Sequence, residues 1–225
     1  MVSATAGFKV LGTQFTLEGK CSAEIKCRMS AAWGKFHSLW PLLGKRDGNL
    51  GKRLRLFDTC VSQTALWCSE ARLLTEKEKR LLQTPENTML RRISGPRRRP
   101  DEPWVDWIKR STRRAVLAAK EHGVRLWKEA HLKNKWGWAG HVLRMDVSRI
   151  ARRAVEWRDS EWQATEYLMP SLLRIRRQGR KRWFRWEDDL HGYADHCGLV
   201  SWQSEAKQRD KWLAHCDRFV NFIKR

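Results

Sequence analysis

The sequence predicts a mainly α protein, with a small β-hairpin near its N-terminal end followed by one group of helices and a second helical region. Two observations predict this class. Apolar residues recur at helical spacing in most segments of the chain, and glycines and prolines separate these segments. Hydrophobic residues make up 41% of the 225 residues, which is enough to form a buried apolar core.

The β-prone segment occupies residues 8–17, with the sequence FKVLGTQFTL. Gly12 divides it into two short runs, and Glu18 with Gly19 closes it, a pattern typical of a hairpin. A two-stranded hairpin is only marginally stable by itself, so we expect it to lead out of a larger sheet. We assign residues 1–20 to this hairpin.

Helical spacing begins at Ser22, and Pro41 with Gly44 predicts the end of the first helix. Its apolar face comprises Ile25, Met29, Ala32, Trp33, Phe36 and Trp40. A second helix is predicted from about Leu50. Its apolar face comprises Leu54, Phe57 and Val61, and its outer, basic face comprises Lys52, Arg53 and Arg55.

A third helix is predicted to begin at Thr75, because Glu78 three residues later completes a capping box. Pro85 predicts a kink, or a restart with Thr84 as the new cap, since proline cannot donate the backbone hydrogen bond of a helix interior. The helix is expected to end at Gly95. Residues 21–95 therefore form one predicted helical domain.

Residues 96–103, PRRRPDEP, combine three prolines with three arginines and predict an extended linker at a domain boundary. The second region, 104–225, is predicted to begin with a helix over 104–122 that Gly123 ends. A last amphipathic helix is predicted from about Ser204. Its apolar stripe comprises Trp212, Cys216, Phe219, Val220 and Ile223.

Charge is the most unusual bulk property of the chain. The sequence has 46 Lys and Arg residues against 25 Asp and Glu residues, a formal net charge of +21. A phosphate-rich partner, RNA or DNA, is the natural counter-charge. A membrane partner is not expected, because no run approaches the roughly 18 apolar residues of a spanning helix and no secretion signal precedes Gly7. We expect the protein in the nucleus or cytoplasm.

The cysteines and tryptophans add weaker information. The six cysteines are widely spread without a CxxC pair, so reduced thiols are expected. The 14 tryptophans could stack on bases, but most are expected to anchor helices in the core.

Four stretches occur in an order that matches a known family. They are FKVLG at 8–12, KWGWAGHVLRM at 135–145, KRWFRWEDDL at 181–190, and W-x6-R-x2-W formed by Trp202, Arg209 and Trp212. Together they make the chain resemble the C-terminal portion of reverse transcriptases from non-LTR (LINE-like) retrotransposons. The resemblance extends over nearly the whole chain.

This resemblance implies roles for several segments. The stretch FKVLG is similar to the primer grip, which would place Leu11 and Gly12 near a nucleic-acid terminus. Residues 21–95 resemble the thumb, whose Lys52 and Arg53 would contact the duplex backbone. The polymerase palm holds magnesium through aspartates, and nothing before Phe8 could supply it, so we expect no catalytic site and no cofactor in this chain. Pro85 interrupts what is a longer helix in the family.

Two basic clusters are the strongest candidates for phosphate contact, although each could also be a solvated loop. They comprise Arg97, Arg98, Arg99, Arg174, Arg176, Arg177, Arg180, Lys181 and Arg182. Acids at 187–189 follow the second cluster and favour the first turn of a helix.

Interpretations that assign a catalytic site to this chain are less favoured. Tyr193-Ala194-Asp195-His196 imitates the polymerase YADD sequence but carries His196 in place of the second aspartate and lies after FKVLG. Asp188 and Asp189 are adjacent, so their side chains cannot face one metal site. A nuclease could use Asp101 with Glu205-x-Lys207, a pattern that arises easily by chance.

A zinc site and an inert relic are the remaining alternatives. The candidate zinc ligands are His191, His196, Cys197, His215 and Cys216. Structural zinc sites usually have spaced ligand pairs, whereas His215 and Cys216 are adjacent in the sequence. His141 lacks a nucleophile or acid partner and is expected to be structural. A relic would fold poorly after losing the sheet against which its hairpin and thumb packed.

Overall fold

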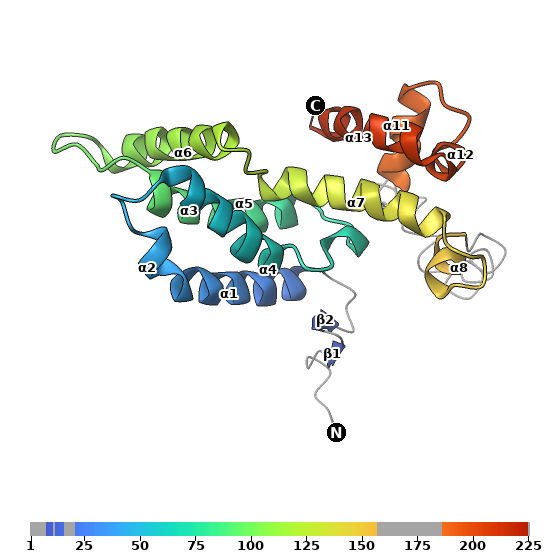
Figure 1. Cartoon of the computed structure of the whole chain (residues 1–225), viewed down its shortest axis with the longest axis horizontal. Helices are drawn as coiled ribbons and strands as arrows, with labels where there is room; N and C mark the ends of the chain where they lie inside the picture. The colour runs from blue at the N-terminus through green and yellow to red at the C-terminus, as the bar shows by residue number, and fades with distance from the viewer. Residues whose placement is uncertain (1–7, 11, 16–20, 157–185, 225) are drawn as a thin grey trace, which may run out of the picture. The chain divides into compact units, whose positions relative to one another are not determined.

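The computed structural model describes residues 8–10, 12–15, 21–156 and 186–224 (Figure 1). The chain divides into two compact units, Met1–Asn134 and Lys135–Arg225. Helices dominate the described part of both units, which confirms the predicted mainly α class. Within the described residues, none of the helices combines the length and the apolar character needed to cross a bilayer.

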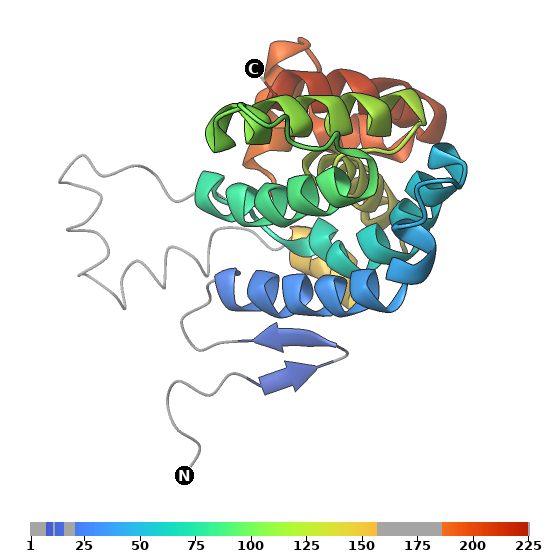
Figure 2. The same cartoon turned by 90° about the vertical axis from the view of Figure 1, so that its left-hand side faces the viewer.

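The predicted hairpin is present. Strands β1 (Phe8–Val10) and β2 (Thr13–Phe15) pair antiparallel, with Val10 opposite Thr13. Gly12 has φ +84°, a left-handed conformation that side chains other than glycine rarely adopt. The described residues contain no third strand, so the hairpin does not join a larger sheet there; it lies beside α1 (Figure 2).

Helix α1 (Ser22–Ser38) follows the predicted apolar spacing. Its buried apolar residues are Ile25, Met29, Ala32 and Phe36. Trp33 is half-buried and Trp40, at the start of the short helix α2 (Trp40–Leu43), is exposed. The predicted apolar face is therefore correct over the first four turns of α1. It ends at α2, whose buried residue is Leu43 and not Trp40.

The second predicted helix is broken into several pieces. Helix α3 (Leu50–Leu56) begins after Asn49, whose side chain accepts a hydrogen bond from the Lys52 backbone N–H. A π-helical segment η1 (Phe57–Ser62), helix α4 (Gln63–Ala65) and a 3-10 turn η2 (Ser69–Ala71) follow. All three residues of the predicted apolar face, Leu54, Phe57 and Val61, are fully buried.

Helix α5 (Glu76–Ser94) begins with the predicted capping box, in which Thr75 and Glu78 bond each other's backbone N–H. The predicted restart at Thr84 is wrong, because the helix continues through Pro85. Burial on both sides of the proline explains this, since Leu82 and Met89 are both buried in the core. That burial offsets the one backbone hydrogen bond that proline removes.

Helix α6 (Trp104–Glu121) ends before Gly123 as predicted, but it does not begin a new compact unit. It packs along α5, and Arg91 on α5 donates a 2.9 Å hydrogen bond to the hydroxyl of Thr112 on α6. The structure therefore places the division at 134/135 and not in the predicted linker. An amphipathic helix has to bury its apolar face, and α5 is the neighbouring helix that covers it.

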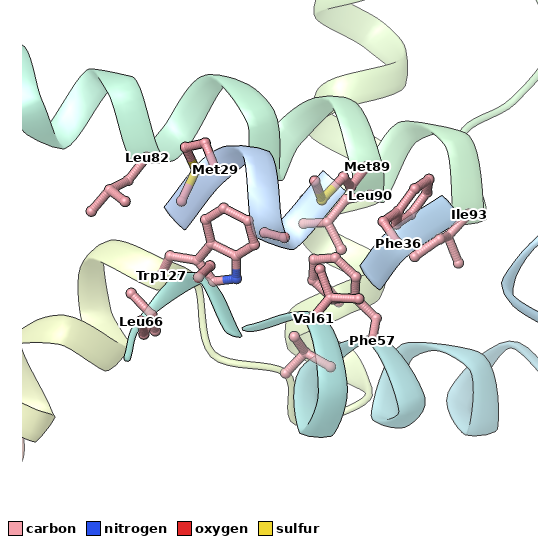
Figure 3. Close-up of a cluster of buried hydrophobic side chains, with 14 of the residues drawn as sticks. Met29, Phe36, Phe57, Val61, Leu66, Leu82, Met89, Leu90, Ile93 and Trp127 are labelled. Atoms are coloured by element: carbon pink, nitrogen blue, oxygen red, sulfur yellow. The ribbon is translucent and has the colours of Figure 1, made fainter. Parts of the chain in front are cut away.

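The core of the first unit lies between α1, α5 and the segment around η1 (Figure 3). Trp127, the first residue of α7 (Trp127–Leu143), inserts into it. The Trp127 ring stacks on Phe57 at a centroid distance of 6.1 Å, and its indole N–H donates to the Ser62 hydroxyl at 2.8 Å. In both views α5 lies between α1 and α6 (Figures 1 and 2).

The described part of the second unit contains the end of α7, α8 (Ile150–Glu156), α11 (Asp188–His196), α12 (Trp202–Lys207) and α13 (Arg209–Ile223). The sequence predicted one continuous helix from about Ser204. The structure has two, because Gln208 adopts an extended conformation between them. Trp212, Phe219 and Val220 of the predicted stripe are buried.

Candidate nucleic-acid interface

Three acidic residues of the first unit are buried and make their contacts inside it. Buried Glu24 forms ion pairs with Arg28 at 2.7 Å and Arg72 at 3.0 Å, and its carboxylate also accepts from the Gln14 backbone N–H. Buried Glu78 completes the capping box of α5, and buried Glu86 accepts a 2.7 Å hydrogen bond from the Trp127 backbone N–H. These carboxylates therefore do not offset positive charge at the surface.

The exposed side chains of residues 21–134 are accordingly rich in cations. The exposed lysines and arginines are Lys26, Lys35, Lys45, Arg46, Lys52, Arg55, Lys77, Arg80, Arg92, Arg97, Arg98, Arg99, Lys109, Arg113, Arg114, Lys120 and Arg125. The exposed acids in the same range are Asp47, Glu76, Asp101, Asp106 and Glu121. Such an imbalance produces a positive surface potential over this unit.

The segment 96–103 is a closed loop and not the extended linker that the sequence predicted. The carboxylate of Glu102 forms a two-point hydrogen-bonded ion pair with Arg110, with both distances 2.6 Å. The indole N–H of Trp107 donates to the Pro96 carbonyl at 3.0 Å, and Arg98 Nε donates to the Glu102 carbonyl at 2.8 Å. These bonds hold the loop against the first turns of α6.

This loop presents the first predicted basic cluster to solvent, since Arg97, Arg98 and Arg99 are all exposed. The hydrogen bond from Arg110, together with its positive charge, lowers the pKa of Glu102 to about 2. The carboxylate therefore stays ionised, and the loop keeps its ion pair, at all physiological pH values.

The two candidates on α3 differ from each other. Lys52 is exposed, as a phosphate contact requires. Arg53 is half-buried, and its NH1 donates to the carbonyls of Leu43 at 3.0 Å and Ile93 at 2.9 Å. Burial lowers the pKa of this guanidinium. Arg53 thus satisfies carbonyls at the ends of α2 and α5, a structural role that the sequence pattern did not reveal.

The hairpin candidate Gly12 accepts a hydrogen bond from Arg28 of α1 through its carbonyl, so the turn is held to the helical body. Leu11 lies outside the described residues. So does the second basic cluster, which comprises Arg174, Arg176, Arg177, Arg180, Lys181 and Arg182.

Three of the four sequence blocks that carry the family resemblance contribute residues to the core of the second unit. Trp136 and Trp212 stack with centroids 3.6 Å apart and planes within 4°, and each indole N–H donates to the other residue's carbonyl at 2.8 Å. Gly140 lies against this pair, because a Cβ there would be 2.4 Å from the Trp212 indole nitrogen. Trp136, Trp212 and Gly140 therefore have a packing role.

A second set of contacts joins the remaining block to the same core. The buried ammonium of Lys135 lies 2.6 Å from both carboxylate oxygens of Asp189 and 5.3 Å from the ring centroid of Trp186. Tyr193 packs edge-on against Trp136 at 5.4 Å. Sequence spacing alone did not predict that these blocks assemble, since they are separated by up to 76 positions.

The YADD-like sequence lies on α11, in helix and not in a strand hairpin. Burial raises the pKa of Tyr193, whose hydroxyl lies 2.8 Å from Nδ1 of His215. Asp188 and Asp189 occupy the first turn of α11, as the sequence predicted. These residues therefore serve helix formation and packing.

The candidate zinc ligands make other contacts in the described part of the chain. His191 accepts from the Trp202 indole N–H at 3.2 Å, and His196 stacks on Phe222 at 4.9 Å. Among the residues that the structure describes, no three His, Cys, Asp or Glu side chains are grouped so that they could hold a metal ion.

Comparison with known proteins gives one informative match. No protein-family model matches the sequence, and no solved structure matches it. A protein of Caenorhabditis elegans whose name describes it as transposon-derived is 27% identical over 214 residues, which cover 91% of this chain and 67% of the relative. This match supports a transposon-related origin. Because the aligned residues extend over nearly the whole chain, that origin applies to both compact units of this transposon-related protein.

Proposed function

We propose that this transposon-related chain is a nucleic-acid-binding part of a non-LTR retrotransposon reverse transcriptase, corresponding to the thumb and the region after it. In this proposal it holds RNA or DNA mainly through phosphates and does not polymerise by itself. The observation that carries the proposal is the surface of residues 21–134, where exposed lysines and arginines far outnumber exposed acids. Polyanion binding is the use that such a surface fits best.

Two further observations support the proposal. The helices that display these cations are fixed by a continuous apolar core, so the charges are held on a defined scaffold (Figure 3). The transposon-derived relative agrees with a role in handling nucleic acid, which every mobile element requires. The hairpin contains the segment that resembles the primer grip. Glu24 and Arg28 of α1 bond this hairpin, so the segment lies next to the helices that carry the cations.

Binding of the purified chain to labelled RNA hairpin, RNA–DNA hybrid and duplex DNA tests the proposal. Fluorescence anisotropy at about 50 and 200 mM salt should show an affinity that falls steeply with salt, with a log–log slope of about −0.9 per duplex phosphate contact. Affinity that does not change with salt, or no binding to any of the three at the lower salt concentration, contradicts the proposal.

A charge-matched pair of variants tests where the phosphates bind. Replacing Arg97 and Arg99 by alanine removes two exposed charges from the loop and keeps the backbone atoms through which these residues bond Arg110 and Glu102. Replacing Lys26 and Lys35 removes the same charge from α1. We expect the loop variant to reduce the salt slope on duplex DNA by about 1.8 and the α1 variant to change it less. Equal losses would indicate attraction without a defined interface.

A further inference from the structure

The loop that carries the arginine cluster also exposes a tryptophan. Trp104, the first residue of α6, is 59% exposed, and its neighbour Val105 is 58% exposed. By contrast, Trp127, Trp136, Trp202 and Trp212 are fully buried. An exposed indole beside a group of arginines combines an apolar aromatic face with positive charge.

The exposed ring is held in place by its neighbours. Its centroid lies 4.6 Å from that of Trp107, with the planes tilted by 48°. Trp107 is in turn fixed by its hydrogen bond to the Pro96 carbonyl, and Arg110 is fixed by its two bonds to Glu102. A ring with restricted motion loses little conformational entropy when a ligand packs on it.

The same bonds bring the backbone at the start of the arginine cluster next to Trp107. Pro96 is bonded to Trp107, so the adjacent Arg97 begins next to the tryptophan pair. Arg110 also donates to the Arg97 carbonyl at 3.2 Å, which closes the loop at this point. The loop that precedes α6 (Figure 1) thus carries exposed arginines next to the exposed indole of Trp104.

We propose that Trp104 stacks on an unpaired base while Arg97 and Arg99 hold the adjacent phosphates, so that this loop binds single-stranded nucleic acid. The proposal rests on the proposed function and adds the kind of strand. Arginines alone would hold a duplex equally well, because phosphates are accessible in both. The face of a base is accessible to an indole only when the base is unstacked, and such stacking is tolerant of sequence.

The test compares a labelled single strand of about 12 nucleotides with a blunt duplex of the same length. We expect Trp104→Ala to weaken binding of single-stranded RNA and DNA about tenfold, and to change duplex binding by less than about twofold. Trp104→Phe should keep most of the affinity, because a phenyl ring also stacks. Val105→Ala is the matched control, since it shortens a neighbouring apolar side chain that is exposed to the same fraction but has no ring. This variant should bind the single strand and the duplex as wild type does.

An abasic strand of the same length separates stacking from charge. Wild type and Trp104→Ala should bind it equally, because it offers phosphates and no bases. The proposal is overturned if Trp104→Ala leaves single-strand binding unchanged, or weakens single-strand, duplex and abasic binding alike. If salt-sensitive duplex binding persists in that case, the proposed function stands without this refinement; if wild type binds none of the probes, the proposed function itself falls. Circular dichroism melts of each variant establish that the fold is retained.

Discussion

Glu86 provides the sharpest test of the first unit's core. Its side chain is 1% exposed, and it accepts a hydrogen bond from the Trp127 backbone N–H at 2.7 Å. Burial raises the pKa of this carboxyl from its ordinary value of 4.5 to about 8, although the hydrogen bond from Trp127 opposes the shift. Glu86 is therefore protonated in the folded protein at pH 7 and ionised in the unfolded chain.

The sign of the pH dependence follows from this difference. Because the folded pKa is the higher one, folding takes up a proton, and the unit is most stable below about pH 4.5 with respect to this group. Stability falls as the pH rises toward 8. The pH of 7 lies 2.5 units above the ordinary pKa of 4.5 that Glu86 has in the unfolded chain, which corresponds to about 3 kcal/mol of lost stability at neutral pH. Glu86→Gln, which resembles the protonated acid and keeps the acceptor oxygen, should recover most of it.

Urea unfolding of wild type and Glu86→Gln at pH 5 and pH 8, followed by circular dichroism, measures this effect. The difference between the two proteins should be small at pH 5 and grow by a few kcal/mol at pH 8. Taking the difference removes the contributions of all other titrating groups. Glu121→Gln, which changes an exposed carboxylate on α6, is the control and should show no such growth. A difference that is the same at both pH values would refute the reasoning.

Two further substitutions test local packing. Gly140→Ala places a Cβ 2.4 Å from the Trp212 indole nitrogen. It should lower the melting temperature of the second unit, with a loss of stability of about 1–3 kcal/mol. Gly137→Ala is the control on the same helix: its Cβ meets no atom within 4 Å, and it should stabilise the helix by up to about 1 kcal/mol. Thr75→Ala removes the hydroxyl that bonds Glu78 and should reduce the urea midpoint by an amount equivalent to about 1 kcal/mol, whereas Thr75→Ser should retain it.

Local signals in the sequence predicted the helices well. Apolar spacing identified the buried residues of α1 and of the segment around η1, and the capping box located the start of α5. The errors arose where tertiary packing overrides a local rule. Pro85 breaks helices in general, yet here burial on both sides keeps α5 continuous. The proline-rich segment 96–103 looked extended, yet Glu102 and Trp107 bond it into a closed loop.

The candidate interface was predictable only in part. Charge counting identified Arg97 to Arg99 and Lys52, which are exposed as a contact requires. It could not distinguish Arg53, whose guanidinium satisfies two backbone carbonyls, because that role depends on helix ends 10 and 40 positions away from it in the chain. It also did not identify Trp104, since exposure of a tryptophan is decided by which face of α6 packs on α5.

The structure also changes what the family resemblance means for function. Trp136, Trp212, Gly140 and the Lys135–Asp189 pair, all in matching blocks, lie in the packed interior of the second unit. Side chains used for packing are unavailable to a ligand, so these particular residues stabilise the fold and do not form a binding surface. Residues that contact nucleic acid must then be sought among exposed positions. The loop at 96–103, with its arginines and the adjacent Trp104, satisfies that condition in the first unit.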